Sequence, residues 1–186
     1  MAILQKNEER LMTGEELARH PEFQPCELVN GRVVPMTLTE FGHGDLALEI
    51  GARLRAWAKE TGRGRTAVGD VAIYTRRNPD SVRGADVVYI SHERYARRSA
   101  LTWLDVTPEL VVEVFSSDGR WSELSRKAQE YLAAGALRVW LVHPRKREIA
   151  VHRASAQLET LGIGDTLRDE EILPGFSLPL SELFQD

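Results

Sequence analysis

The chain has 186 residues, of which 42% are hydrophobic and 28% are charged, with a formal net charge of −4. This length can bury a sizeable core and no linker-like stretch divides it, so we expect one domain over residues 1–186. The negative charge argues against a tight, non-specific polyanion binder, because such binding depends on neutralising phosphates. A local basic groove is still compatible with it.

Cysteine content and hydropathy bear on the compartment. Cys26 is the single cysteine, which excludes a disulfide framework. The first residues soon become charged, unlike a signal peptide, and no apolar stretch approaches membrane-spanning length. We therefore expect a cytoplasmic protein without a membrane partner.

In chain order, the first half of the sequence predicts a short helix at about 15–20, a β-hairpin at 26–34, a helix at about 43–60, and strands at about 66–74 and 86–91. Thr13 and Glu16 have the spacing of a capping box, which favours the first helix. Asn30-Gly31 between β-branched segments is typical of a tight hairpin turn.

The second half predicts a strand around Glu113, a helix at about 121–134, strands at 137–142 and 148–152, and then a short strand, a turn and a terminal helical piece. Strands and helices that alternate around a mostly apolar sheet indicate an α/β (α+β) domain. We expect a central mixed β-sheet flanked by helices, with an N-terminal β-hairpin.

Two acids interrupt apolar strands in the middle of the sequence. Glu113 lies within the run 108–115, and Asp86 enters the hydrophobic run 83–90. A buried ionised carboxylate needs a metal, a cationic partner or a raised pKa. Acids delivered by two core strands therefore suggest one divalent-metal site.

Lys127 and Glu27 are two further candidates. Lys127 follows the helical spacing of Leu124, Ala128 and Tyr131, so it points along the buried stripe towards the acids. Its aliphatic stem could instead pack while the ammonium reaches solvent. Glu27 lies on the first hairpin strand, and any of the three acids could equally be the ion-pair partner of an arginine.

Metal-assisted hydrolysis of a phosphodiester uses such a set of three acids and one lysine. Carboxylate oxygens hold Mg²⁺, the metal lowers the pKa of a bound water, and a lysine offsets charge that develops on the phosphate.

The same residues carry a resemblance to a known family. The ordered motifs are Cys26-Glu27-Leu28-Val29-Asn30-Gly31, His43, Gly84-Ala85-Asp86-Val87, Leu110-Val111-Val112-Glu113-Val114-Phe115-Ser116, Lys127 with Tyr131 and Gly135, Val139-Trp140-Leu141-Val142, and Leu173-Pro174-Gly175-Phe176. Together they resemble the Uma-two family of the PD-(D/E)XK restriction endonuclease-like superfamily, over about residues 13–184. Each motif is weak alone, and the ordered set is fairly specific.

The resemblance implies a nuclease core in which Asp86 and Glu113 are the metal-binding acids and Glu27 is an accessory acid. We expect the metal to be Mg²⁺ or Mn²⁺, with the Val114 carbonyl as a further ligand. Ala85 stands where the superfamily has proline, which we expect to be a mild departure. Phe115 stands where the superfamily usually has its lysine, so Lys127 would supply the ammonium from the neighbouring helix.

The remaining candidates are weaker. His43 faces inward from the start of its helix, where a packed or capping role is favoured over a catalytic one. The arginines that could contact phosphates are Arg76, Arg77, Arg94, Arg97 and Arg98, the last three sharing a face if their segment is helical. His143, His152 and Cys26 lack zinc-ligand spacing.

We therefore expect a metal-dependent DNA endonuclease that hydrolyses phosphodiester bonds. The alternative to this function is that the chain is a catalytically inactive nucleic-acid-binding or regulatory protein of the same fold. A two-carboxylate glycoside hydrolase is a further rival, but the sequence lacks recognisable aromatic sugar platforms and that chemistry does not need Lys127. Double-strand cleavage with one site per chain would favour a homo-oligomer, a dimer or higher.

Overall fold

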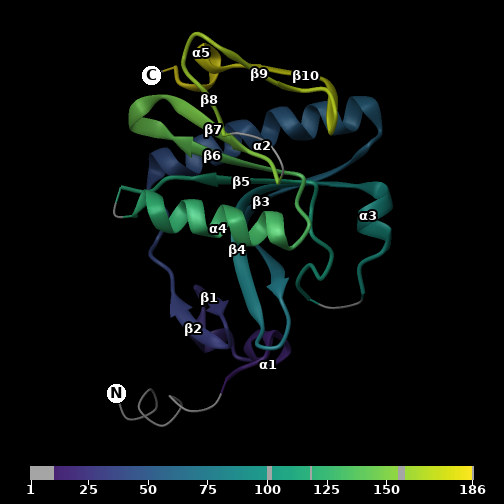
Figure 1. Cartoon of the computed structure of the whole chain (residues 1–186), viewed down its shortest axis with the longest axis vertical. Coiled ribbons are helices and arrows are strands. Elements are labelled where there is room, and N and C mark those ends of the chain that lie inside the picture. Colours follow the sequence, from purple (N-terminus) through teal and green to yellow (C-terminus); the bar gives the residue numbers. More distant parts are fainter. Residues whose placement is uncertain (1–10, 100–101, 118, 155–157, 186) are drawn as a thin grey trace.

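The computed structural model describes residues 11–99, 102–117, 119–154 and 158–185, which form a central β-sheet with helices on both faces (Figure 1). The strands of this sheet are β1 (Cys26–Val29), β2 (Arg32–Pro35), β3 (Gly64–Arg76), β4 (Ser81–Ser91), β5 (Leu110–Val114), β6 (Arg138–His143), β7 (Glu148–His152) and β8 (Glu159–Leu161). Their order is β2-β1-β4-β5-β6-β7-β8, and β3 also pairs with β4. Because β5 and β6 run parallel while the other pairs are antiparallel, the sheet is mixed, as predicted.

Two long helices cover opposite faces of the sheet. Ile50 and Leu54 of α2 (Phe41–Thr61) pack in one core with Trp140, whereas Ala128 and Tyr131 of α4 (Trp121–Ala133) pack in the other. The shorter helices are α1 (Gly14–Ala18), α3 (His92–Ala96) and α5 (Leu180–Leu183), with 3-10 turns η1 (Pro21–Phe23) and η2 (Pro144–Lys146). None of the helices in the described ranges is both long and apolar enough to cross a membrane.

Strand β5 shows why Glu113 faces helix α4. Val112 and Val114 belong to the core beneath α2, and Val111 belongs to the core beneath α4. Side chains alternate along a strand, so Glu113 shares the side of Val111. The fully buried strand therefore carries its single charge to the face where Lys127 lies.

Local signals in the sequence set several element ends. Asn30 and Gly31 both have left-handed φ values, 50° and 75°, which gives the tight hairpin turn between β1 and β2. The Thr13 side chain accepts from the Glu16 amide, and the Glu16 carboxylate accepts from the Thr13 amide, so the capping box is confirmed. Gly62 ends α2 at a φ of 64°.

The C-terminal region contains more strand than the sequence predicted. Beyond β8, a second sheet pairs β9 (Thr166–Asp169) with β10 (Leu173–Pro179). Leu167, Leu173 and Leu178 bury this hairpin in the α2-side core. Pro174 and Gly175 interrupt the alternation of β10, which explains why the sequence predicts only a short strand and a turn here.

Candidate active site

Asp86 and Glu113 meet where strands β4 and β5 stop pairing. The last pair at this end of the ladder is Val87↔Val112, so Asp86 and Glu113 are the next residue on each strand. The amide of Val114 donates to Oδ2 of Asp86 at 2.6 Å, which fixes the carboxylate between the strands. Both acids line one cavity of ≈ 520 Å³. The structure thus brings together the two acids expected at a metal site.

Glu113 is the more deeply buried acid, with only 3% of its surface exposed. Its Oε2 accepts from Nζ of Lys127 and its Oε1 from the hydroxyl of Tyr131, each at 2.9 Å. Burial raises the pKa of Glu113 to about 8; Lys127 opposes this shift, and the charge of Asp86 adds to it. The carboxylate is therefore held by two donors from α4 in a place that disfavours negative charge.

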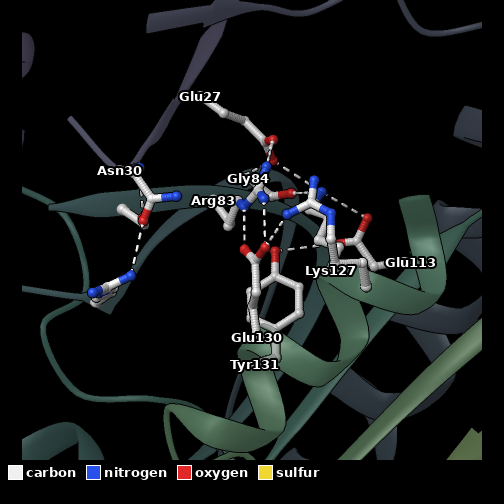
Figure 2. Close-up of polar contacts among 11 residues, drawn as sticks. Glu27, Asn30, Arg83, Gly84, Glu113, Lys127, Glu130 and Tyr131 are labelled. Atoms are coloured by element: carbon white, nitrogen blue, oxygen red, sulfur yellow. Dashed lines mark hydrogen bonds and ion pairs between the residues drawn. The ribbon is translucent and has the colours of Figure 1, made fainter. Parts of the chain in front are cut away.

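Lys127 is the central cation of the site (Figure 2). Its Nζ lies 2.9 Å from Glu113, 3.0 Å from Oε1 of Glu27 and 2.7 Å from the carbonyl of Gly84. Although burial lowers the pKa of Lys127, the charges of Glu113 and Glu27 outweigh it and raise the pKa above its usual value. Lys127 thus stays charged. Its ammonium group points into the site, whereas the alternative interpretation had placed it in solvent.

Glu27 approaches the same place from β1 (Figure 2). Its Oε2 accepts from Arg83 at 2.7 Å, and its Oε1 accepts from the amide of Gly84 at 3.0 Å and faces Lys127. Arg83 also makes two bonds to Glu130, at 2.7 and 2.8 Å. Burial raises the pKa of Glu27, but the positive charges of Lys127 and Arg83 together lower it by more. The pKa is therefore below its usual value. Glu27 therefore pairs with an arginine, as the alternative interpretation predicted, and contacts Lys127 as well.

His43 contacts an acid of the site, which the sequence did not predict. Its Nε2 lies 3.0 Å from Oδ1 of Asp86, and it lines the same cavity. The hydrogen bond to Asp86 raises the pKa of His43, whereas burial lowers it. His43 faces inward, as predicted, because α2 starts at Phe41 and turns it towards β4, where it packs against Asp86; a catalytic role stays a prediction.

Asp70 also lines this cavity, and sequence analysis missed it. Burial raises the pKa of Asp70 and the charge of Asp86 adds to this, whereas Lys127 and His43 lower it. Its sequence signal was Gly69-Asp70 within a strand, since glycine inside a strand pattern indicates a bulge or a close approach.

Val114 and Phe115 also line the cavity. Val114 contributes the amide that holds Asp86; a role of its carbonyl in metal binding stays a prediction. The ring of Phe115 lies 5.7 Å from that of Trp121 and 4.9 Å from that of His143, between centroids. Phe115 thus joins an aromatic cluster, and the ammonium of the site comes from α4.

The arginines proposed as phosphate contacts are engaged elsewhere. Arg94 donates to the carbonyls of Thr107 and Gly135 and pairs with Glu109. Helix α3 ends at Ala96, so the expected helical face shared with Arg97 and Arg98 does not form. The others pair as follows: Arg97 with Glu93, Arg98 with the ring of Tyr95, Arg76 with Asn30, and Arg77 with Glu15 and Asp80.

The donor atoms at the cavity are hard oxygens. Within the part of the chain that the structure describes, no three His, Cys, Asp or Glu side chains form a ready-made metal cage. Both oxygens of Asp86 and of Glu113 have protein donors. Carboxylate oxygens suit Mg²⁺ or Mn²⁺ rather than softer metals.

Comparisons with known proteins bear on the family and the fold of the chain. A family model described as "Uma2: Putative restriction endonuclease" matches residues 15–181. A crystal structure from Anabaena variabilis, described as a "putative nuclease belonging to DUF820", superposes with a TM-score of 0.81 at 17% identity, covering 93% of this chain and 97% of that one. No curated protein matches. The structural likeness shows that the two chains share a fold, and together with the family model it supports the restriction endonuclease-like fold that was predicted.

Proposed function

The chain belongs to the Uma2 family, and from this membership and the geometry of its cavity we propose that it is a metal-dependent DNA endonuclease. One observation carries the proposal: Asp86 and Glu113 line one cavity, and Lys127 donates to Glu113 at 2.9 Å. Two acids beside a charged lysine are the groups that metal-assisted phosphodiester hydrolysis uses.

The residues present fit a Mg²⁺ or Mn²⁺ ion by their chemistry. Mg²⁺ usually keeps several waters and takes one or two carboxylates, so Asp86 and Glu113 suffice without a cage of three acids. The Val114 carbonyl is the further ligand that the sequence suggested. When bound, such an ion polarises a phosphoryl oxygen and lowers the pKa of a water molecule.

The other side chains would position these groups. His43 and the Val114 amide hold the two oxygens of Asp86, and Tyr131 holds one oxygen of Glu113. Glu27 helps to keep Lys127 charged and directed into the cavity. Lys127 would then stabilise negative charge on the phosphate while water adds to phosphorus and the bond to the leaving oxygen breaks.

One observation favours the alternative, a catalytically inactive nucleic-acid-binding or regulatory protein. Lys127 has three hydrogens to donate, and three acceptors already surround its Nζ. A phosphate must displace at least one of them. If that exchange does not occur, the fold would bind nucleic acid without cutting it.

Cleavage assays separate the two functions. We expect the purified chain to nick or cut DNA with Mg²⁺ or Mn²⁺ and to stop when a chelator is added. Glu113→Ala, purified in parallel, should be inactive, whereas Asp45→Asn, an exposed acid that does not line the cavity, should cut normally. Cutting by the Glu113 variant would reveal a contaminant or another site. DNA binding without cleavage, across substrates and both metals, would favour the regulatory alternative.

A further inference from the structure

The turn between β6 and β7 carries consecutive basic residues. The 3-10 turn η2 contains Arg145 and Lys146, Arg147 follows it, and all three residues are exposed. The amide of Lys146 donates to Nδ1 of His143 at 3.4 Å, and Arg147 ends the turn at a left-handed φ of 55°. The cations of this basic turn are therefore held on a short, regular backbone.

The basic turn lies next to the cavity of the proposed active site. Phe115 lines the cavity, and its amide donates at 2.9 Å to the carbonyl of Val142, near the end of β6. The ring of His143 lies 4.9 Å from that of Phe115 and 5.4 Å from that of Trp121, the first residue of α4. The β6–β7 turn and the start of α4 accordingly lie at the same edge of the molecule, on the left in Figure 1. Aromatic contacts thus connect the cavity wall to the basic turn.

Arg120 adds a cation at the cavity itself. It directly precedes Trp121 and lines the cavity, and 80% of its side chain is exposed. Its guanidinium lies 3.6 Å from the carboxylate of Glu123, but an ion pair between two exposed side chains contributes little. Arg120 is therefore able to exchange this partner for another anion.

Arg145 and Lys146 differ from the engaged arginines that the sequence proposed as phosphate contacts. Among the described residues, neither of these two cations has an ion-pair partner. One acid, Glu148, pairs with His143 in the register of β6 and β7. Burial lowers the pKa of His143, Lys146 lowers it further, and Glu148 opposes them with a smaller influence than Lys146. The basic turn therefore presents positive charge on a chain whose net charge is −4.

A DNA strand is the partner whose charge fits this surface. A phosphate beside Lys127 is part of a chain in which each nucleotide adds another negative charge. That chain has to leave the cavity, and the wall with Arg120 and Phe115 leads to the basic turn. A polymer of phosphates can occupy the cavity and the turn at once, whereas a single phosphate group cannot. Contacts of arginine and lysine with phosphates hold such a strand in position.

We propose that Arg145 and Lys146, together with Arg120, form a binding surface for the sugar-phosphate backbone of the DNA strand that leads out of the cavity. This inference rests on the proposed function, and it names the path of the substrate beyond the reacting phosphate. The surface supplies affinity and positions the strand, while the chemistry stays with the groups of the cavity.

DNA binding at several salt concentrations tests this surface. The variant Arg145→Gln/Lys146→Gln removes two charges from the basic turn, and the matched control, Arg55→Gln/Lys59→Gln, removes two exposed cations of α2 that do not line the cavity. Fluorescence anisotropy of labelled DNA, in chelator to prevent cutting, gives Kd between about 50 and 200 mM salt. The Kd of the turn variant should rise at least about tenfold at the lowest salt. The slope of log Kd against log salt should fall by about two, one for each lost phosphate contact, and the control should bind like the wild type.

Cleavage kinetics separate a binding role from a chemical one. The turn variant should need more DNA to reach half of its maximal rate, while its single-turnover rate at saturating DNA stays within about twofold of the wild type. Unrelated DNA sequences should show the same loss of affinity, because phosphate contacts do not distinguish bases. Arg120→Gln should lower the salt slope by about one.

The outcomes distinguish this inference from the proposed function. If the wild type cuts DNA and the turn variant binds it with the same Kd and salt slope, only the role of the turn is overturned. An equal loss in the control variant also overturns it, because net charge alone would then explain binding. If the wild type binds through the turn but cuts no substrate with Mg²⁺ or Mn²⁺, the endonuclease proposal fails and the surface stands. A wild type that binds no DNA overturns both.

Two further results bear on the fold of the turn. Weaker binding with an unchanged salt slope would mean that the turn supports the structure alone, which overturns the proposal. Should the double variant not fold, Arg145→Gln and Lys146→Gln take its place singly, and each should lower the salt slope by about one.

Discussion

Two buried ionic clusters of this protein differ in whether their charges line a cavity. In the structural cluster, Arg138 of β6 pairs with Asp169 of β9 and with Glu171, and so joins the C-terminal hairpin to the central sheet. In the cluster that we propose is catalytic, called the catalytic cluster (Glu27, Asp86, Glu113 and Lys127), acids from three strands and the lysine of α4 line the cavity of ≈ 520 Å³, and Lys127 pairs with Glu27 and Glu113. Acids outnumber the cation in both clusters, but only the acids of the second line a space large enough for a ligand.

We propose that this difference separates a buried ion pair that supports the fold from one that supports chemistry. Arg138 has a planar fork of donors that satisfies the acids on both sides of it. Lys127 is a point charge shared by Glu27, Glu113 and a carbonyl. Removing a charge should therefore mainly reduce stability in the structural cluster, and mainly reduce turnover in the catalytic cluster.

The largest expected effect is on cleavage by Glu113→Gln. This variant keeps the shape of the side chain but loses the charge, so activity should fall about 10³-fold or more. The free energy of unfolding without metal should stay within about 1 kcal/mol of the wild type or increase, because burial already disfavours the charged form of Glu113. Parallel nuclease assays and urea unfolding check both values. A large loss of stability would mean that Glu113 mainly supports the fold, as Asp169 does.

Lys127→Ala should affect both properties. Loss of the ammonium should lower turnover roughly 10²–10³-fold, by analogy with the removal of one group that stabilises a transition state. It also leaves Glu27 and Glu113 without their shared cation, at a cost of about 3–5 kcal/mol for a broken buried pair. Single-turnover cleavage and urea unfolding measure the two effects. A destabilised variant with nearly full turnover would mean that Lys127 serves the fold alone.

Arg138→Met tests the structural cluster by the same logic. We expect the free energy of unfolding to fall by about 3–5 kcal/mol, because Asp169 stays buried without its partner. Cleavage per folded molecule should be unchanged, since Arg138 does not line the cavity. Chemical unfolding gives the first value, and cleavage at low temperature with a measured folded fraction gives the second. A selective loss of cleavage would contradict the separation of the two clusters.

Tyr131→Phe should give the smallest effect. It removes the hydroxyl that donates to Glu113 at 2.9 Å and leaves the packed ring in place. We expect a stability loss of about 1–3 kcal/mol for the lost hydrogen bond. Turnover should fall about 10–100-fold, as when a group that orients a metal ligand is lost. An unchanged turnover, with an unchanged dependence of cleavage on metal concentration, would show that Tyr131 does not orient Glu113.

The sequence by itself determined the elements whose signals are local. The Thr13 capping box, the Asn30-Gly31 turn and the spacing around Lys127 depend on residues within a few positions of each other, and they predicted the corresponding structure. An acid in an apolar strand was equally visible, because burying a charge without a partner costs too much to be accidental. Glu27, Asp86, Glu113 and Lys127 could therefore be selected before their geometry was known.

Only the tertiary structure decided which groups meet these residues. The contact of His43 with Asp86 depends on how α2 crosses the sheet, and the approach of Asp70 depends on a register shift between β3 and β4. Neither follows from periodicity, because pairing register and helix placement are set by packing between distant segments. The same reason applies to Arg94, whose acceptors at Thr107 and Gly135 come from other parts of the chain.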